Sequence, residues 1–184
     1  MNKRSTSQPP RFMPDEPFPP YAYVPGETPH PKRDRGGHSY GAEFEIPEPP
    51  NLEDWRACRD YLYGIDLFNY GYYWEAHEAW EGLWVACGRR GLTATYLQAL
   101  ISLAAAGLKA RSGSARGMRA NAGKAARRLE SVVSHAGSHR TRYMGLDVRA
   151  LADFATAISK APQTTGTAAG DENLPAFELL LWPE

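Results

Sequence analysis

The sequence predicts an all-α protein, a compact bundle of about five helices preceded by an extended N-terminal arm rich in proline and glycine. Two observations predict this class. Apolar residues recur at helical spacing in successive segments of residues 51–160, with no strong strand-like alternation. Most of the prolines fall in residues 1–50, where they exclude helix because proline lacks a backbone donor. Residues 161–184 are expected to form a flexible link and an apolar tail.

The first two helices are expected to form a hairpin. Asn51 is a favourable N-cap for the first helix, which should end near Gly71. The second helix should run from Tyr72 to Cys87, because Gly88 favours the end of a helix. Its buried face is predicted from apolar spacing and is listed here: Tyr73, Ala76, Trp80, Leu83 and Cys87.

Three more helices complete the predicted bundle. The third, Thr93–Arg111, is apolar nearly all round and should be central, with a small-residue run at 104–107 that admits a close neighbour. The fourth should start after Ser114 as N-cap, and the fifth at Asp147. Residues 164–170 are expected to be a flexible link, and the final AFELLLWPE to dock as a short extended segment.

The arm, residues 1–50, is expected to be extended and disordered at its start. Its second half is expected to lie on the helical domain, because six aromatic side chains accompany the prolines. These aromatic residues are Phe12, Phe18, Tyr21, Tyr23, Tyr40 and Phe44.

Bulk properties restrict the function class. The 184 residues suit one domain with tails, and a formal net charge of zero argues for neither a nucleic-acid binder nor a membrane-surface protein. Cys58 and Cys87 form no disulfide framework, and the N-terminus lacks a secretory signal, so we expect a cytoplasmic protein. The longest apolar run, Tyr96–Leu108, is interrupted by polar residues and is expected to be a buried core helix.

The densest chemistry lies in the second helix. On a helical projection Tyr73, His77 and Trp80 share one side with Trp84, while Glu81 and Trp74 lie at its margin. The same projection points Glu75 toward solvent. His77 and Glu81 are four residues apart and should be neighbours, so the carboxylate can orient one ring nitrogen and leave the other for a proton, metal or ligand.

These positions give a candidate site. His77, Glu81 and Glu78 are the candidate catalytic residues, and His77 with Glu81 the candidate ligands of a divalent metal. Candidate ligand-binding residues are Trp74, Tyr73, Gln98 and Trp80. The pair is equally open to interpretation as a structural contact among aromatic residues. Gln98 is expected either beside His77 or Glu81 or bonded to backbone.

A metal site needs further ligands. Asp66 of the first helix and His30 or His38 of the arm are candidates, although incidental histidines in the arm are the favoured alternative. The pattern His77-Glu78-x-x-Glu81 matches only part of the zinc-peptidase motif HExxH. The third helix contains no Asp, Glu or His, which argues against a di-iron bundle.

The charges are polarised along the chain. Seven basic and no acidic residues lie between Lys109 and Arg128, whereas ten acidic and two basic residues lie between Glu43 and Glu81. A basic fourth helix could bind phosphate or RNA. The favoured alternative is a solvated face that pairs with the acidic half or with another subunit.

The segment FNYGYYWEAHEAWEGLW, residues 68–84, resembles the signature of the prokaryotic domain-of-unknown-function family 309. The segments YLQALISLA, residues 96–104, and RSGSARG, residues 111–117, resemble its second block, with Ala99 in place of Gly and Ser114 in place of Asn. The resemblance covers about Asp54 to Glu130. It implies a small all-helical bundle and no specific activity.

The leading hypothesis is therefore an uncharacterised bundle with a small-molecule or metal-assisted site around residues 75–81. The rival is a non-enzymatic helix-hairpin interaction module in which the His77–Glu81 pair is structural. Phosphate or RNA binding through the fourth helix is a weaker alternative. The expected partners are a small molecule or a protein, a homo-oligomer is compatible with the sequence, and no membrane partner is expected.

Overall fold

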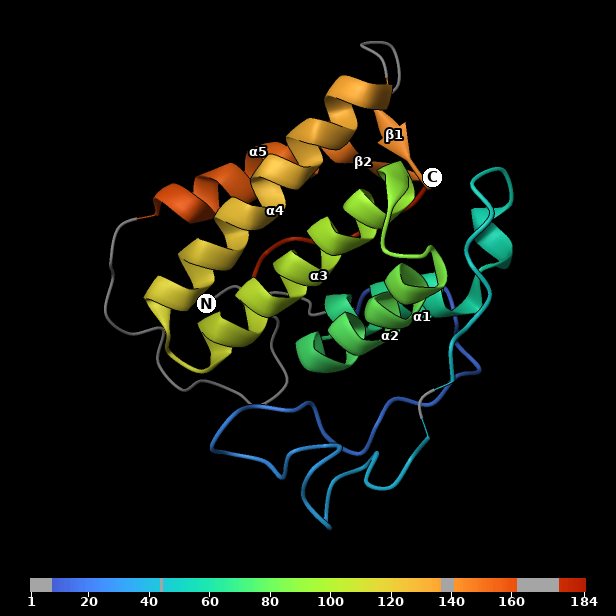
Figure 1. The fold of residues 1–184 in the computed structure, drawn as a ribbon. Coiled ribbons are helices and arrows are strands. Elements are labelled where there is room, and N and C mark those ends of the chain that lie inside the picture. Colours follow the sequence, from blue (N-terminus) through green and yellow to red (C-terminus); the bar gives the residue numbers. More distant parts are fainter. Residues whose placement is uncertain (1–7, 44, 137–140, 162–175) are drawn as a thin grey trace.

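A computed structural model describes residues 8–43, 45–136, 141–161 and 176–184, and it confirms the predicted all-α bundle (Figure 1). Within these residues five α-helices pack on one another in chain order, each against the next. The predicted disordered start of the arm and the predicted link at 164–170 lie outside the described residues.

Four helices follow the sequence prediction to within a few residues. Their bounds, with the shorter first helix, are α1 Arg59–Asn69, α2 Tyr73–Ala86, α3 Gly91–Arg111, α4 Ala115–Ala136 and α5 Val148–Lys160. The predicted caps form as well. The Ser114 hydroxyl accepts the Gly117 N–H at 3.3 Å, and the Asp147 carboxylate accepts the N–H groups of Arg149 and Ala150.

The first helix was predicted to start at Asn51, and that start is wrong. The Asn51 side chain instead accepts the Glu53 N–H at 3.0 Å in a local turn, and a short 3-10 helix, η1 (Trp55–Ala57), follows. Asparagine competes with helix through such local bonds. The extended backbone of Cys58 then separates η1 from α1, so that Trp55 packs edge-on against the Tyr61 ring in the core.

Two glycines allow close helix contacts in the core. A Cβ at Gly107 of α3 would lie 2.6 Å from the Tyr73 ring, so only glycine admits this ring, as the small-residue run predicted. A Cβ at Gly64 of α1 would lie 2.3 Å from Trp80 Nε1, which itself donates to the Tyr61 carbonyl. Both contacts seat α2 between α1 and α3.

A two-stranded hairpin connects α4 to α5 and was not predicted. Strands β1 (Arg142–Tyr143) and β2 (Leu146–Asp147) pair antiparallel around Met144 and Gly145, which both have positive φ, as two-residue hairpin turns require. Met144 is buried and its carbonyl accepts the Tyr61 hydroxyl at 2.7 Å. Strands this short carry too little alternation for a sequence signal.

The arm and the tail both pack on the helices (Figure 1). In the arm, the N–H groups of Phe12 and Met13 donate to Asp66 of α1, both at 2.8 Å. The tail docks as an extended segment, as predicted. The side-chain amide of Asn69 bonds both the N–H and the carbonyl of Leu181, at 2.8 and 2.9 Å.

Helix α3 is long and apolar enough to cross a membrane, but it is the core helix of this bundle. More than half of its most apolar stretch is buried inside the protein. This burial agrees with the interpretation of Tyr96–Leu108 as a core segment.

Candidate functional site

Helix α2 carries the candidate site, and its two faces have different surroundings. Gly71, with φ of 81°, separates it from α1, and Arg111 of α3 donates to the Gly71 carbonyl. Tyr73, Ala76 and Trp80 are at most 1% exposed and anchor one face in the core. His77, Glu78 and Glu81 lie outside this face and remain partly exposed.

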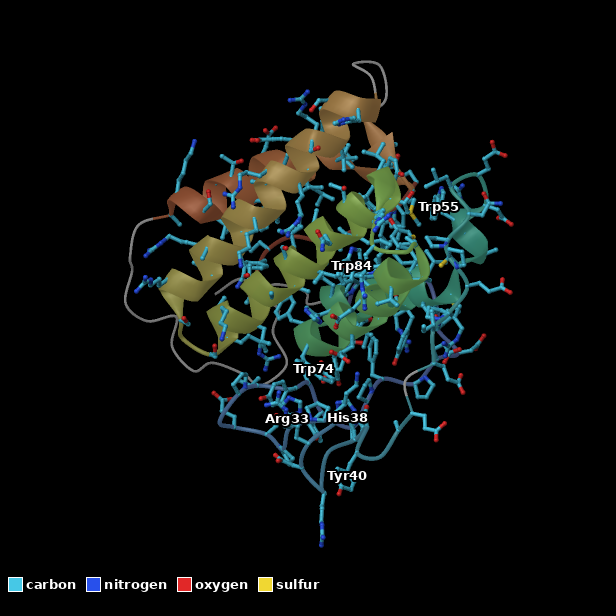
Figure 2. The ribbon with its side chains drawn as sticks, viewed as in Figure 1. Arg33, His38, Tyr40, Trp55, Trp74 and Trp84 are labelled. Carbon is cyan, nitrogen blue, oxygen red and sulfur yellow. The ribbon has the colours of Figure 1, made fainter. Side chains whose placement is uncertain are left out.

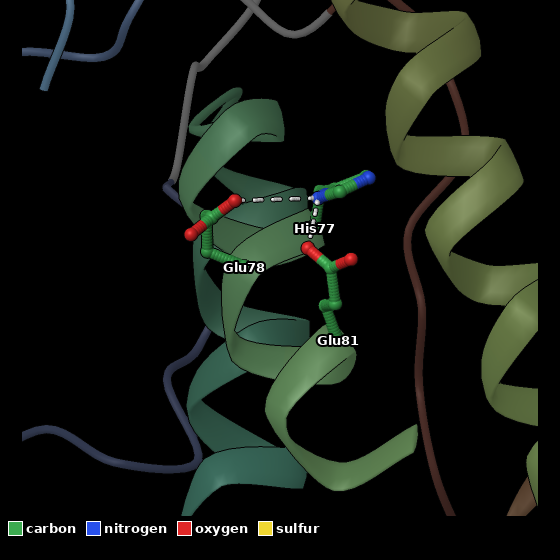
Figure 3. Close-up of side chains that lie close together, drawn as sticks. All are labelled: His77, Glu78 and Glu81. Carbon is green, nitrogen blue, oxygen red and sulfur yellow. Dashed lines mark ion pairs between the residues drawn. The ribbon is translucent and has the colours of Figure 1, made fainter. Parts of the chain in front are cut away.

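The side chains of His77, Glu78 and Glu81 converge on this partly exposed side of α2 (Figure 3). Nδ1 of His77 lies 3.7 Å from Oε2 of Glu81 and 3.8 Å from Oε1 of Glu78. Both distances exceed hydrogen-bonding range, and Nδ1 is buried with no hydrogen-bond partner in the described part of the chain. Figure 3 shows one ring nitrogen facing both carboxylates, with the rest of the ring and its second nitrogen directed away from them.

The site is half-buried rather than dry. The side chains of His77, Glu78 and Glu81 are 31%, 23% and 42% exposed, so water reaches all three. Lys32 of the arm forms an ion pair with Oε2 of Glu78 from outside the helix. Burial disfavours the ionised Glu78 carboxyl, but His77 and Lys32 outweigh it and lower its pKa below the ordinary value.

One ligand atom from each residue fits a single metal ion. The three atoms all lie within 4.8 Å of one another. In a tetrahedral site with bonds of about 2.1 Å, ligand atoms are roughly 3.4 Å apart, so small side-chain rotations suffice. The set offers one imidazole and two carboxylates, which suits divalent manganese, iron or zinc.

Comparison with protein families found a match for the central part of the chain. Residues 61–121 match the family model described as Domain of unknown function (DUF309). This match supports the resemblance to that family that residues 68–84 and 96–117 carry. No curated protein and no solved structure matches the chain. The DUF309 segment begins in α1 and ends within α4, so it contains His77, Glu78 and Glu81, whereas the arm that supplies Lys32 lies outside it.

Two predicted ligand-binding residues of the DUF309 segment lie in the core. Tyr73 is 1% exposed, and its hydroxyl accepts the Ala176 N–H of the tail at 2.8 Å. Trp80 is fully buried against Gly64. Neither ring is open to a ligand beside His77, because the helical turn that brings them near the histidine also turns them inward.

The predicted contact between Gln98 and His77 or Glu81 is not formed. Oε1 of Gln98 instead accepts Nε of Arg128 at 3.2 Å, and Nη1 of Arg128 donates to the Ser102 hydroxyl at 2.9 Å. The side chains of Gln98 and Ser102 on α3 therefore face α4 rather than α2. Helical spacing shows that Gln98 and Ser102 share one side of α3, but it does not show which helix packs against that side.

Glu75 was predicted to point toward solvent, and this is wrong. The side chain is buried because the arm of residues 21–40 covers it; Oε1 accepts the Tyr23 N–H at 2.9 Å and contacts Nε2 of His38 at 3.0 Å. Burial raises the pKa of the Glu75 carboxyl, an effect that these hydrogen bonds oppose. Its other oxygen is buried without a partner among the described residues.

The remaining candidate ligands contact other groups. His30 and His38 both pack edge-on against Trp74, at the junction of arm and α2 where Figure 2 labels Trp74 and His38. Asp66 receives the backbone of the arm and lies 3.5 Å from Nε of Arg11. His30 and His38 therefore pack against Trp74, one helical turn from His77.

Lys32 is the arm residue at the site that was not predicted from the sequence. Only its place two residues after His30, in the PHPK segment, could have suggested it.

Proposed function

We propose that this protein binds a divalent metal ion through His77, Glu78 and Glu81, and that the ion keeps open positions for a small molecule. The observation that supports this proposal best is the buried Nδ1 of His77, which has no hydrogen-bond partner among the described residues yet lies within 3.8 Å of two carboxylates. An unsatisfied buried nitrogen costs about 1–3 kcal/mol, and a bound cation would remove that cost. A tetrahedral coordination shell with three protein ligands has a fourth position for water or a ligand.

The ion would supply Lewis acidity and an acidified bound water, and the chain would supply its placement. His77 would act as ligand, or as general base where no metal is bound, with Glu81 as its orienting carboxylate. Lys32, already paired with Glu78, would compete with the ion for that carboxylate. We expect the small molecule to be a cytoplasmic metabolite.

Titration of the metal-free protein with Mn²⁺, Zn²⁺ and anaerobic Fe²⁺ tests the proposal. We expect about one ion per chain by calorimetry and elemental analysis, and at least roughly tenfold weaker binding by His77→Ala and Glu81→Gln, since each loses one ligand. His135→Ala and Glu130→Gln, both on exposed positions of α4, are matched controls and should bind as the wild type does. Equal, negligible metal in wild type and His77→Ala would refute the metal site.

The second candidate is a non-enzymatic interaction module, and the tail supports it. Leu180 and Trp182 alternate with buried Leu181, and they remain 51% and 45% exposed on the outer side of the docked tail. Exposed apolar side chains of this size are typical of protein contacts. If the protein has this function, His77→Ala should lower the free energy of unfolding without changing partner binding. Trp182→Ser should abolish partner binding, which light scattering measures as a loss of self-association where the partner is a second copy of the chain.

A further inference from the structure

An open hollow of about 320 Å³ lies between α3 and α4, on a part of the molecule that the proposed metal site does not use. Helix α3 separates it from α2 (Figure 1). Three cations and two hydroxyl groups line it: Thr95, Lys124, Arg127, Arg128 and Ser131. The four from α4 are spaced at i, i+3, i+4 and i+7, so they form one stripe along the helix.

Both walls of this hollow lack negative charge. The sequence from Arg89 to Leu129, which includes α3 and most of α4, contains nine basic residues and no acidic one. The next acidic residue on α4, Glu130, lines a different hollow with Arg149 and Asp153 of α5. No acidic side chain is therefore among the lining residues of this hollow, and its lining is positively charged.

Arg128 is fixed in place by neutral partners. Its Nε and Nη1 groups donate to Gln98 and Ser102, and none of the carboxylates in the described residues forms an ion pair with it. Burial, and then the neighbouring charge of Arg127, lower the pKa of Arg128. Both effects are penalties on a guanidinium that stays charged, and a bound anion would relieve them.

We propose that this groove binds the phosphate group of a small phosphorylated molecule. Arg128 presents a pre-oriented guanidinium, and exposed Lys124 and Arg127 supply two further charges within one helical turn. The Ser131 hydroxyl can donate to a remaining phosphate oxygen, whereas the Thr95 hydroxyl already donates to the Gly91 carbonyl at 3.1 Å. The volume of this hollow is at the low end for small-molecule pockets. No aromatic ring is among its lining residues, which disfavours the base stacking of a single-stranded nucleic acid.

Calorimetry on the full chain at physiological salt tests this, with inorganic phosphate, glucose 6-phosphate, AMP and a single-stranded RNA as probes. We expect the phosphate monoesters to bind, and the double variant Lys124→Gln/Arg127→Gln to bind them at least about tenfold more weakly. The double variant Arg116→Gln/Arg149→Gln removes the same charge from exposed positions outside the groove and should bind normally. His77→Ala should also bind normally, which separates this site from the metal site.

Three results would overturn the proposal. Equal weakening in both double variants would show a general charge effect rather than a site. Salt-sensitive binding of RNA with no binding of the monoesters would assign the groove to nucleic acid. Failure of all probes to bind the wild-type chain would leave the basic stripe as a solvated surface. Arg128→Lys keeps the positive charge but removes the planar guanidinium. It should weaken the binding of the phosphate monoesters, because the orientation of that guanidinium is part of the site.

Discussion

Nε2 of His38 lies 3.0 Å from Oε1 of Glu75, and these side chains are only 6% and 4% exposed. The same carboxylate oxygen accepts the backbone N–H of Tyr23 at 2.9 Å. Two points of the arm thus converge on one oxygen in the first turn of α2. Because Glu75 precedes His77 by two residues, this contact fastens the arm beside the candidate metal site.

His38→Ala should release this part of the arm. The substitution leaves a buried carboxylate with one partner fewer, so we expect a loss of about 1–3 kcal/mol in the free energy of unfolding. Amide exchange should become faster in residues 21–40 and in the first turn of α2. His135→Ala, at an exposed position near the end of α4, should change neither quantity. Unchanged exchange in His38→Ala would mean that other contacts alone hold the arm.

Lys32→Gln should strengthen metal binding, if the ion binds where we propose. Lys32 occupies Glu78 as a tethered cation, so an incoming ion must displace it or share the carboxylate. Removal of this competitor should raise the affinity for Mn²⁺ about two- to tenfold, a change typical of a half-exposed ion pair. Arg35→Gln removes an equal charge from an exposed arm position and should leave the affinity unchanged. Weaker binding in Lys32→Gln would show instead that the lysine supports the site.

The fold was largely predictable because most of its helices depend on local sequence patterns. Periodic apolar spacing fixed α2 and α3, and the side chains of Ser114 and Asp147 cap their helices as expected. Asn51 failed as a cap because its side chain bonds its own turn at Glu53. A cap and an isolated turn use the same residue types, so the sequence alone does not separate them.

The site was predictable only where it depends on one helix. The spacing of His77 and Glu81 brings them together whatever surrounds α2. The contacts of Glu75 and Gln98 depend on which segment packs against each helix face. The arm covers Glu75, and α4 packs against Gln98. Such long-range packing has no local pattern, and a helical projection shows direction without showing the neighbour.

Gly64→Ala and Gly123→Ala should change stability in opposite directions. At Gly64 the added Cβ would lie 2.3 Å from the Trp80 ring, which is fully buried and cannot move aside, so we expect a loss of about 1–3 kcal/mol or more. At Gly123 of α4 the nearest atom would be 3.6 Å away, and alanine's helix propensity should add up to about 1 kcal/mol. Urea unfolding measures both. A neutral Gly64→Ala would contradict the close α1–α2 contact.

The buried tyrosines should make the protein sensitive to alkali. Burial raises the pKa of Tyr73 to about 12, although the backbone N–H of Ala176 partly opposes this, and burial also raises the pKa of Tyr61 and Tyr96. In the unfolded chain these phenols ionise near pH 10. Between these values the unfolded state binds fewer protons than the native state, so the free energy of unfolding falls as pH rises. Tyr73 alone should account for a loss of about 2–3 kcal/mol over this interval.

Tyr73→Phe isolates this contribution. Below about pH 10 the variant should be less stable than the wild type by roughly 1 kcal/mol, because the hydrogen bond from the Ala176 N–H is lost. As pH rises toward about 12, the wild type loses the protonation advantage of Tyr73 and the variant does not, so the difference should shrink and then reverse. Urea midpoints measured at about pH 8 and pH 11 give both values, with exposed Tyr40→Phe as the control. Parallel pH profiles for the wild type and Tyr73→Phe would show that the Tyr73 hydroxyl titrates normally and is not shielded by the tail.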